Sequence, residues 1–162
     1  MFLPKYLFRE ITQISPEFLH SHGIECLLMD FDNTMLPYTT DIPSRELLDW
    51  AHNLEASDIS LCIVSNSKRP RVPRFSQAYG IPCVTHCHKP GTAGICRAMG
   101  NRPKSSVALV GDQIFTDVLG ANCAGITSIL VKPINNHNIW LKLRHVLEQP
   151  FIALSAKRRI TL

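Results

Sequence analysis

The chain has 162 residues, of which 45% are hydrophobic and 19% are charged, and it carries a formal net charge of +4. This composition is typical of a globular protein that buries its own core, and it excludes a disordered or collagen-like chain. No apolar run approaches the roughly 18–20 residues that a membrane-spanning helix needs, and residues 1–16 lack the apolar region of a signal peptide. We therefore expect one cytoplasmic domain over residues 1–162, with no transmembrane segment; anionic partners are favoured and nucleic acid is not expected.

Short apolar segments alternate with longer amphipathic segments along the sequence. In chain order the pattern predicts a strand over residues 25–30, a helix over 44–57, a strand over 59–65, a helix over 71–80, a strand over 82–86, a helix over 91–100, a strand over 106–112, a helix over 116–125, a strand over 127–131 and a helix over 139–149. Ser44 is the expected N-cap of the first helix, and Gly80 is expected to end the second. The strands lack polar–apolar alternation, as expected when helices cover both faces of a sheet. The sequence therefore predicts an α/β fold with a doubly wound parallel sheet of about five strands, a core over about residues 22–149 and a basic tail over 150–162.

Polar side chains follow the predicted strands at the point where each strand ends. These residues are Asp30 and Asp32 after the first strand, Ser65 and Asn66 after the second, Lys89 after the third, and Asp112 after the fourth, with Asp117 five residues later. Ligands bind beyond the carboxyl ends of the strands in such sheets, so these side chains are expected to face one crevice. Any one of the aspartates alone is explained as well by a helix cap or a turn. The whole set at one edge instead favours a functional site.

The pair Asp30 and Asp32 indicates the chemistry. Two carboxylates about 4 Å apart repel by on the order of 1 kcal/mol in water, and by more when partly buried. A hard cation such as Mg²⁺ prefers carboxylate oxygens and would offset this repulsion. An ionised aspartate can attack phosphorus, while a second carboxylate donates a proton to the leaving oxygen and then takes one from water. With Ser65 and Lys89 holding the phosphoryl oxygens, the set predicts Mg²⁺-dependent phosphoryl transfer.

Four short motifs resemble those of the haloacid dehalogenase (HAD) superfamily of phosphatases, in the same order. They are DFDNT at 30–34, VSNS at 64–67, HKP at 88–90 and GDQIFTD at 111–117. The longer segments LPKYLFREITQI, HGIECLLMDFDNTMLP, GDQIFTDVLGANCAGI and ILVKPI resemble the YqeG-type, subclass IIIA branch, which is related to mitochondrial phosphatidylglycerophosphate phosphatase. The resemblance implies a Rossmann-like, HAD-like fold and a Mg²⁺-dependent mechanism through a phosphoaspartate.

The resemblance also implies a role for each site residue. Asp30 would be the nucleophile and a metal ligand, and Asp32 would be the general acid/base, with its backbone carbonyl on the metal. Lys89 would bridge the nucleophile and the phosphate, while Thr34 and Ser65 would contact the phosphate with Asn66 beside them. Asp112 would be a Mg²⁺ ligand, and Asp117 would support the site through a metal-bound water. Two positions depart from the usual pattern. Asn33 stands where many members have glycine, and asparagine also tolerates a left-handed backbone. Ser67 stands where the branch has asparagine, which leaves the chemistry intact and is expected to alter substrate contacts.

The spacing of the motifs leaves no room for a cap domain. Thirty-two residues separate Asp32 from Ser65, and 23 separate Ser65 from Lys89. Each interval is enough for one helix and one strand, whereas many HAD phosphatases carry a cap at these places. We therefore expect an open crevice, which suits a substrate presented by a surface or a macromolecule, or a site completed by a second subunit of a homo-oligomer.

Basic and apolar residues near this crevice raise the hypothesis of an anionic lipid substrate. The basic residues are Lys68, Arg69, Arg71 and Arg74, together with AKRR at 156–159, which follows the apolar PFIAL at 150–154. The apolar residues that would insert into the membrane surface, called the apolar foothold below, are Phe2, Leu3, Tyr6, Leu7 and Phe8. Each basic residue near an anionic bilayer contributes on the order of 1 kcal/mol. The hypothesis is that the enzyme removes the terminal phosphate of phosphatidylglycerophosphate as a peripheral protein on the inner membrane face. The alternatives are a solvated loop, a frayed tail and an N-terminal helix packed on the core, with a soluble sugar, nucleotide or protein phosphate as substrate.

Three other interpretations compete with an enzyme of this kind. A response-regulator receiver domain has a similar acid cluster, but its acid pair is adjacent and its phosphorylated aspartate follows the third strand. A catalytically silent scaffold would have no reason to keep such costly charges together. A zinc site at CVTHCHKP (83–90) would need a second ligand pair that the sequence does not offer. The six cysteines are scattered through apolar stretches, which favours buried, reduced thiols.

Overall fold

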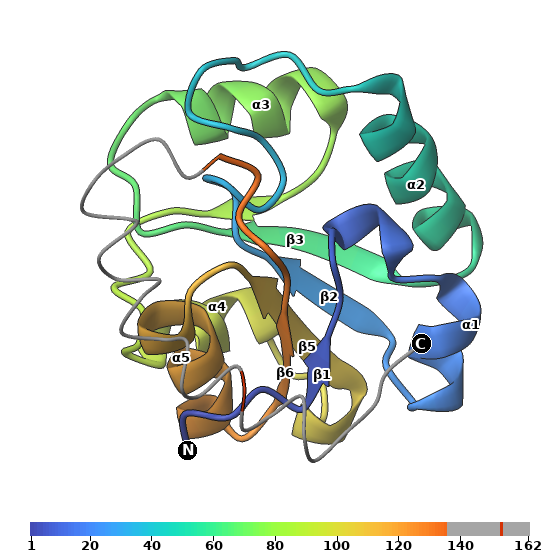
Figure 1. Cartoon of the computed structure of the whole chain (residues 1–162), viewed down its shortest axis with the longest axis vertical. Helices are drawn as coiled ribbons and strands as arrows, with labels where there is room; N and C mark the ends of the chain where they lie inside the picture. Colours follow the sequence, from blue (N-terminus) through green and yellow to red (C-terminus); the bar gives the residue numbers. More distant parts are fainter. Residues whose placement is uncertain (136–152, 154–162) are drawn as a thin grey trace.

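The computed structural model describes residues 1–135 and residue 153. The predicted helix over 139–149 and the basic tail over 150–162 therefore lie outside the described residues, apart from residue 153. Within the described part, six strands form one sheet in the order β1-β6-β5-β2-β3-β4, and every neighbouring pair is parallel (Figure 1). The predicted α/β fold with a parallel, doubly wound sheet is confirmed.

Five of the strands lie where the sequence predicts them. They are β2 (Cys26–Met29), β3 (Ser60–Val64), β4 (Cys83–Val84), β5 (Val107–Gly111) and β6 (Thr127–Leu130). The structure adds β1 (Tyr6–Leu7), an edge strand that pairs with β6. The backbone N–H of Lys5 donates to Ser128 O, and that of Phe8 donates to Leu130 O.

The apolar residues of the N-terminal segment pack within the protein, which differs from the expected foothold on a membrane. Tyr6 and Phe8 pack against the larger core, while Phe2 and Leu7 pack beside Ile114 in a smaller cluster. Tyr6 and Phe8 also make edge-to-face contacts with Phe18, at centroid distances of 5.0 and 4.9 Å. These rings are engaged within the protein, and their segment forms a strand where the alternative interpretation expects a packed helix.

The helices begin and end at identifiable residues. They are α1 (Pro16–Ser21), α2 (Arg45–Ala56), α3 (Arg71–Tyr79), α4 (Ala93–Met99) and α5 (Leu119–Ala124), with 3-10 turns η1 (Ile11–Gln13) and η2 (Lys104–Ser106) and a π-helical turn η3 (Ile114–Val118). Ser44 caps α2 as predicted, since its Oγ accepts a bond from the N–H of Leu47. Gly80 ends α3 with a left-handed φ of 73°.

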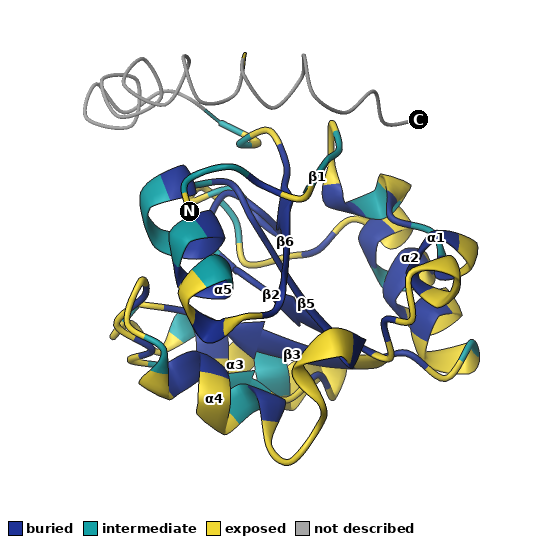
Figure 2. Cartoon of the chain, turned by 90° about the horizontal axis from the view of Figure 1, so that it is seen from below, coloured by how far each residue is buried: buried dark blue, intermediate teal, exposed yellow. Residues whose placement is uncertain are grey.

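Both faces of the sheet are covered, which explains the absence of alternation in the strands. Leu27 and Met29 of β2 face the core that α1, α2 and α3 close, whereas Cys26 and Leu28 face the core that α4 and α5 close. In Figure 2 the central strands are dark blue, and the outward sides of the helices are yellow. Because side chains alternate between the faces of a strand and both faces are dry, every position of β2 is apolar.

The chain order places a topological switch point beside β2. From β2 the chain adds β3 and β4 on one side, then crosses to add β5 and β6 on the other. A crevice forms outside the carboxyl ends of the strands at such a reversal, here between β2 and β5. The intervals from Asp32 to Ser65 and from Ser65 to Lys89 hold only α2 with β3 and α3 with β4. No cap domain is inserted at either place, as predicted.

Candidate active site

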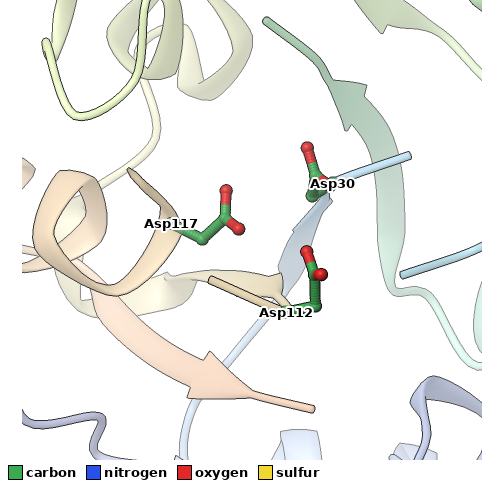
Figure 3. Close-up of side chains that lie close together, drawn as sticks. All are labelled: Asp30, Asp112 and Asp117. Carbon is green, nitrogen blue, oxygen red and sulfur yellow. The ribbon is translucent and has the colours of Figure 1, made fainter. Parts of the chain in front are cut away.

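Three buried aspartates meet at this switch point. Asp30 leaves β2, Asp112 leaves β5 and Asp117 lies in η3, and one carboxylate oxygen from each lies within 4.8 Å of the others (Figure 3). The pairing of β2 with β5 fixes the first two, because the N–H of Asp30 donates to Val110 O at 2.9 Å. These carboxylates are therefore held by rigid elements and not by a mobile loop.

Asp117 is brought back over the end of β5 by the π-helical turn. Its backbone N–H donates to Gln113 O at 3.0 Å, and its Oδ2 accepts from the N–H of Gln113 at 3.2 Å. A Cβ at Gly111 would overlap the Asp117 carboxyl group. The glycine of the fourth motif is therefore required for space, since Asp117 occupies the volume that a side chain would take.

Lys89 lies between two of the aspartates. Its Nζ is 2.6 Å from Asp30 Oδ1, 2.7 Å from Asp117 Oδ1 and 2.8 Å from Val64 O. Asn66 holds the backbone of this lysine from both sides, because its Nδ2 donates to Lys89 O and its Oδ1 accepts from the N–H of Lys89. The amide of Asn66 thus positions Lys89, and its contact with a phosphate stays a prediction.

The two predicted hydroxyls lie at the same edge and are buried. Thr34 Oγ1 is 3.4 Å from Asp112 Oδ1, a long hydrogen bond in which the hydroxyl donates. Ser65 Oγ accepts from the N–H of Ser67 at 3.0 Å, which leaves its own proton available as a donor. The structure therefore brings these hydroxyls to the edge that carries the aspartates and Lys89, at the ends of the strands that the sequence predicts.

The charges of this cluster do not balance. Three carboxylates and one ammonium leave a formal charge of −2 when all four are ionised. Burial, opposed by the charge of Lys89 and reinforced by those of Asp117 and Asp32, raises the pKa of Asp30 to about 7. Burial and the charge of Asp30 raise the pKa of Asp112 well above its ordinary value. Although burial alone would lower the pKa of Lys89, the charges of Asp117 and Asp30 raise it.

The donor set fits a hard divalent cation. Asp117 Oδ1 is buried, and among the described residues its partner is the ammonium of Lys89, 2.7 Å away. The ligand atoms are all carboxylate oxygens, the type that Mg²⁺ prefers over softer sites. A charge of +2 equals the excess negative charge. Asp30, Asp112 and Asp117 are therefore the residues that could hold a metal ion.

The carboxylate of Asp32 is not part of this cluster. Its Oδ1 accepts a hydrogen bond from Arg71 Nη1 at 2.7 Å, so its side chain is turned toward the start of α3. Burial raises the pKa of Asp32, and the charge of Arg71 opposes that rise. Two aspartates one residue apart thus have different cationic partners, Lys89 for Asp30 and Arg71 for Asp32.

Residues 1–135 match the family model described as mitochondrial PGP phosphatase. The chain belongs to the mitochondrial PGP phosphatase family. It is 34% identical over 135 residues to the probable phosphatase YqeG of Bacillus subtilis, covering 82% of this chain and 78% of that protein. It is 27% identical over 143 residues to the chloroplastic phosphatidylglycerophosphate phosphatase 1 of Chlamydomonas reinhardtii, covering 82% of this chain and 53% of that one.

Solved structures share the fold of this PGP phosphatase family member. The cobalt-bound deoxy-D-mannose-octulosonate 8-phosphate phosphatase of Haemophilus influenzae superposes with a TM-score of 0.52 at 18% identity, covering 84% of this chain and 91% of that one. A hypothetical protein from Xanthomonas campestris gives a TM-score of 0.53 at 15% identity, covering 85% and 79%. The chain is a phosphatase of the HAD type, as its four motifs predict, and the receiver and silent-scaffold interpretations are not supported.

Arg71 of the phosphatase corrects one sequence expectation. The sequence groups it with the basic residues that flank the opening, yet only 10% of its side chain is exposed. Besides Asp32 it contacts Asp41, with Nε 2.8 Å from Asp41 Oδ1, and its guanidinium lies 5.0 Å from the centre of the Phe31 ring. The sequence contains one signal that could have indicated its burial. Arg71 is four residues from the apolar Phe75 on α3, a spacing that puts both residues on the same face of the helix. Lys68, Arg69 and Arg74 are exposed as expected.

Tyr38 is a second residue that the sequence did not single out. The residue is 47% exposed and lies between Pro37 and Thr40, whose carbonyls bond Arg71. Burial of its hydroxyl and the charges of Asp32, Asp112 and Asp30 raise the pKa of Tyr38 to about 12. The phenol is therefore protonated over the whole physiological range and can act as a hydrogen-bond donor beside the carboxylates.

Asn33 adopts the left-handed backbone expected of it, with φ of 68°. Its side chain is fully buried and does more than tolerate that conformation. Nδ2 donates to Asn135 O at 2.8 Å, and Oδ1 accepts from the N–H of Asn135 at 3.3 Å. The backbone O of Asn33 also accepts from the N–H of Ile134. The loop that carries both catalytic candidates is thereby tied to the residues after β6.

Proposed function

We propose that this phosphatase hydrolyses phosphomonoesters through a phosphoaspartate formed on Asp30, with Mg²⁺ as its cofactor. The observation that carries the proposal is the position of Lys89 Nζ, 2.6 Å from Asp30 Oδ1 at the carboxyl edge of the sheet. This contact keeps the attacking carboxylate oriented and gives the entering phosphoryl group a fixed positive charge. Asp30, Asp112, Asp117 and the backbone carbonyl of Asp32 would hold the metal ion.

In the first step Asp30 attacks phosphorus. A bond forms between a carboxylate oxygen and phosphorus, and the bond between phosphorus and the ester oxygen breaks. Asp32 donates its proton to that leaving oxygen, so the alcohol departs neutral. Burial raises the pKa of Asp32, against the opposing charge of Arg71, and a raised pKa is the direction that a proton donor needs.

In the second step water releases the phosphoryl group. Asp32, now ionised, takes a proton from the water as its oxygen attacks phosphorus. The bond between phosphorus and the Asp30 oxygen breaks, which returns the carboxylate and frees inorganic phosphate. Ser65 donates a hydrogen bond to a phosphoryl oxygen, and Thr34 does so when its hydroxyl proton turns away from Asp112 Oδ1. Asn66 lies beside them, and Lys89 holds the developing negative charge. Bound Mg²⁺ would supply the positive charge that the cluster lacks and neutralise part of the phosphate charge.

The substrate that we propose is phosphatidylglycerophosphate at a membrane surface. Support comes from membership in the PGP phosphatase family and from the name of the Chlamydomonas relative. It also comes from the site that no cap covers and from three exposed basic residues shortly after Ser65, which are Lys68, Arg69 and Arg74. No helix of the described residues has the length and hydropathy to cross a membrane. The location that goes with this substrate is peripheral, on the inner face of the membrane.

A substrate panel tests the two levels of the proposal separately. Purified protein with Mg²⁺ is given phosphatidylglycerophosphate in mixed micelles, a sugar phosphate, a nucleotide and a phosphopeptide, and released phosphate is measured. We expect the lipid to give the highest kcat/KM, and Asp30→Asn to release no phosphate from any substrate. Preference for a soluble phosphate would overturn the lipid proposal and keep the phosphatase mechanism. Release of phosphate by Asp30→Asn at the wild-type rate would overturn the mechanism itself.

The role of the basic residues is tested by presenting the lipid substrate in vesicles of different charge. The triple variant Lys68→Gln, Arg69→Gln and Arg74→Gln is compared with wild type on vesicles of phosphatidylglycerol and on neutral vesicles of phosphatidylcholine, each doped with substrate. Three charges worth about 1 kcal/mol each predict a loss of on the order of 100-fold in binding to anionic vesicles. Neutral vesicles are expected to show little change, and an equal loss on both would contradict a role at an anionic surface.

A further inference from the structure

Arg71 gathers four oxygen atoms around one buried guanidinium. Nη1 donates to Asp32 Oδ1, and Nη2 donates to Pro37 O at 3.0 Å and to Thr40 O at 2.7 Å. Nε lies 2.8 Å from Asp41 Oδ1 as an ion pair. A rigid fork of five N–H donors is what allows one side chain to make this set of contacts, and the single ammonium of lysine cannot reproduce it.

The two carbonyl contacts enclose a short turn. Pro37 and Thr40 lie on either side of Tyr38, so Nη2 fastens both ends of the segment that carries this ring. Asp41 adds a third attachment immediately after the turn. The loop of residues 37–41 would otherwise depend on its own backbone for its position, because it contains no helix or strand.

The same fork connects this loop to the proposed proton donor. Asp32 and the turn around Tyr38 share Arg71 as their partner, because the guanidinium that bonds Asp32 Oδ1 also bonds the carbonyls of Pro37 and Thr40. The turn that carries Tyr38 is therefore held next to Asp32. Tyr38 is 47% exposed, so part of it is accessible to a substrate. Asp32 gives its proton to the leaving oxygen in the proposed mechanism, so a turn held next to Asp32 is near the leaving group.

We propose that Arg71 is a positioning residue that fastens the loop 37–41, and that Tyr38 on this loop contacts the leaving group of the substrate. The Tyr38 hydroxyl donates a hydrogen bond to an oxygen of the leaving alcohol beyond the ester oxygen. This inference rests on the proposed function, in which the alcohol leaves in the first step. It predicts that Tyr38 discriminates between alcohols that carry such an oxygen and alcohols that do not.

The test uses the full-length protein with Mg²⁺ and compares substrates that have two kinds of leaving group. Phosphatidylglycerophosphate and glycerol 3-phosphate leave an alcohol with further oxygens, whereas phenyl phosphate leaves one without any. Tyr38→Phe is expected to lower kcat/KM about tenfold for the first two, the size of one hydrogen bond, and to leave phenyl phosphate within twofold. Tyr79→Phe, which changes a 37% exposed tyrosine at the end of α3, is the matched control and is expected to change neither.

A double-mutant cycle tests the positioning role of Arg71. Arg71→Lys is expected to lower kcat/KM for every substrate and, in its presence, Tyr38→Phe is expected to have no further effect, because the ring is no longer held in place. Arg45→Gln, at the matching first residue of α2 with a side chain 94% exposed, is the control. Thermal unfolding of each variant separates loss of fold from loss of position. If Arg71→Lys does not fold, Asp41→Asn replaces it, and the effect of Tyr38→Phe is then expected to shrink in part, because the carbonyl contacts of Arg71 remain.

The outcomes distinguish the inference from the function on which it rests. Wild-type protein that hydrolyses none of the three substrates contradicts the proposed function. Wild-type hydrolysis with Tyr38→Phe unchanged on all three, or reduced equally on all three, overturns the contact with the leaving group. Additive effects of Tyr38→Phe and Arg71→Lys overturn the positioning role of Arg71.

Discussion

Two groups of charges flank the end of β2, and they are built differently. In one, Lys89 lies between Asp30 and Asp117, with a third carboxylate, Asp112, close by. In the other, Arg71 joins Asp32 to the loop that ends at Asp41. The first group is buried and has more negative than positive charge. The second is nearer to solvent, and its cation also bonds two neutral carbonyls.

The difference teaches how one strand end can serve two purposes. Excess negative charge in a dry site is costly, and it fits the proposal that this group binds a cation and a phosphate. The Arg71 group has a formal charge of −1 when Asp32 and Asp41 are both ionised, but Asp41 is 66% exposed and solvated. It can therefore hold Asp32, the proposed proton donor, and a loop in place without a second cation. Lysine suits the first group as a compact charge, while the second needs the planar fork of arginine.

The largest effect is expected from removing the cation of the buried group. Lys89→Met leaves three carboxylates together with no positive charge, and losing one partner of a buried ion pair costs about 3–5 kcal/mol. Urea unfolding in EDTA should show this loss of stability, and phosphate release should stop. Lys132→Met, at an exposed lysine, is the control and is expected to stay within about 0.5 kcal/mol of wild type. A Lys89→Met protein as stable as wild type would contradict the charge imbalance.

The next effect separates activity from stability. Asp30→Asn removes the proposed nucleophile and is expected to lower kcat on the order of 10⁴-fold or more. It also removes one of the repelling charges, so the metal-free variant is expected to unfold at a higher urea concentration than wild type at pH 8. Asp49→Asn, on the exposed face of α2, is the control for both measurements. Lower stability of metal-free Asp30→Asn at pH 8 would mean that the Lys89 contact outweighs the repulsion.

The same group predicts an unusual pH dependence in the absence of metal. Because burial raises the folded-state pKa of Asp30 to about 7, its contribution to stability is present below the unfolded value of about 4 and is lost as the pH rises toward 7. The loss amounts to at most about 4 kcal/mol for a shift of this size. Urea unfolding in EDTA from pH 4 to pH 8, compared with Asp30→Asn, isolates this contribution. Mg²⁺ is expected to restore stability above pH 7, and identical curves for the two proteins would contradict the shift.

The smallest effect is expected at the exposed edge of the Arg71 group. The side chain of Asp41 is 66% exposed, and that of Asp49 is 68% exposed; each pairs with the first arginine of a helix, Arg71 and Arg45 respectively. Exposed ion pairs contribute about 0–1 kcal/mol, so both Asp→Asn variants should unfold within that range of wild type. Only Asp41→Asn loosens an attachment of the Tyr38 loop, and it is expected to lower kcat/KM about twofold. Equal kinetics for the two variants would show that the carbonyl contacts of Arg71 suffice.

The sequence is a good guide wherever a pattern repeats or a motif has a fixed place. The strands from β2 to β6 are runs of apolar residues flanked by polar ones, and the ends of these runs locate Asp30, Ser65 and Asp112 from the sequence alone. The absence of a cap follows from counting residues between motifs. These features are local in the chain, so local patterns can predict them.

The features that escaped prediction depend on contacts between distant segments. β1 has only two residues and shows no periodicity of its own; it exists because Tyr6 and Leu7 pair with β6, more than 100 residues away. Arg71 is a basic residue like its exposed neighbours Lys68, Arg69 and Arg74, so the sequence alone does not show that it is buried. Its hydrogen-bond partners at Pro37 and Thr40 come from the folded loop 37–41. The turn of Tyr38 is held next to Asp32 for the same reason, through the bonds of Arg71. A pattern along the chain does not contain the pairing that decides these positions.

Asn33 carries a consequence for the evolution of the site. A glycine there would adopt the left-handed backbone more easily, but it would lose both amide bonds to Asn135, a residue 102 positions away in the chain. Glycine would therefore suit the backbone conformation at this position best, whereas asparagine is needed for the hydrogen bonds to Asn135. A chain that keeps asparagine makes the loop of Asp30 and Asp32 depend on the segment after β6, so changes in that segment can tune the site without touching any of its charged groups.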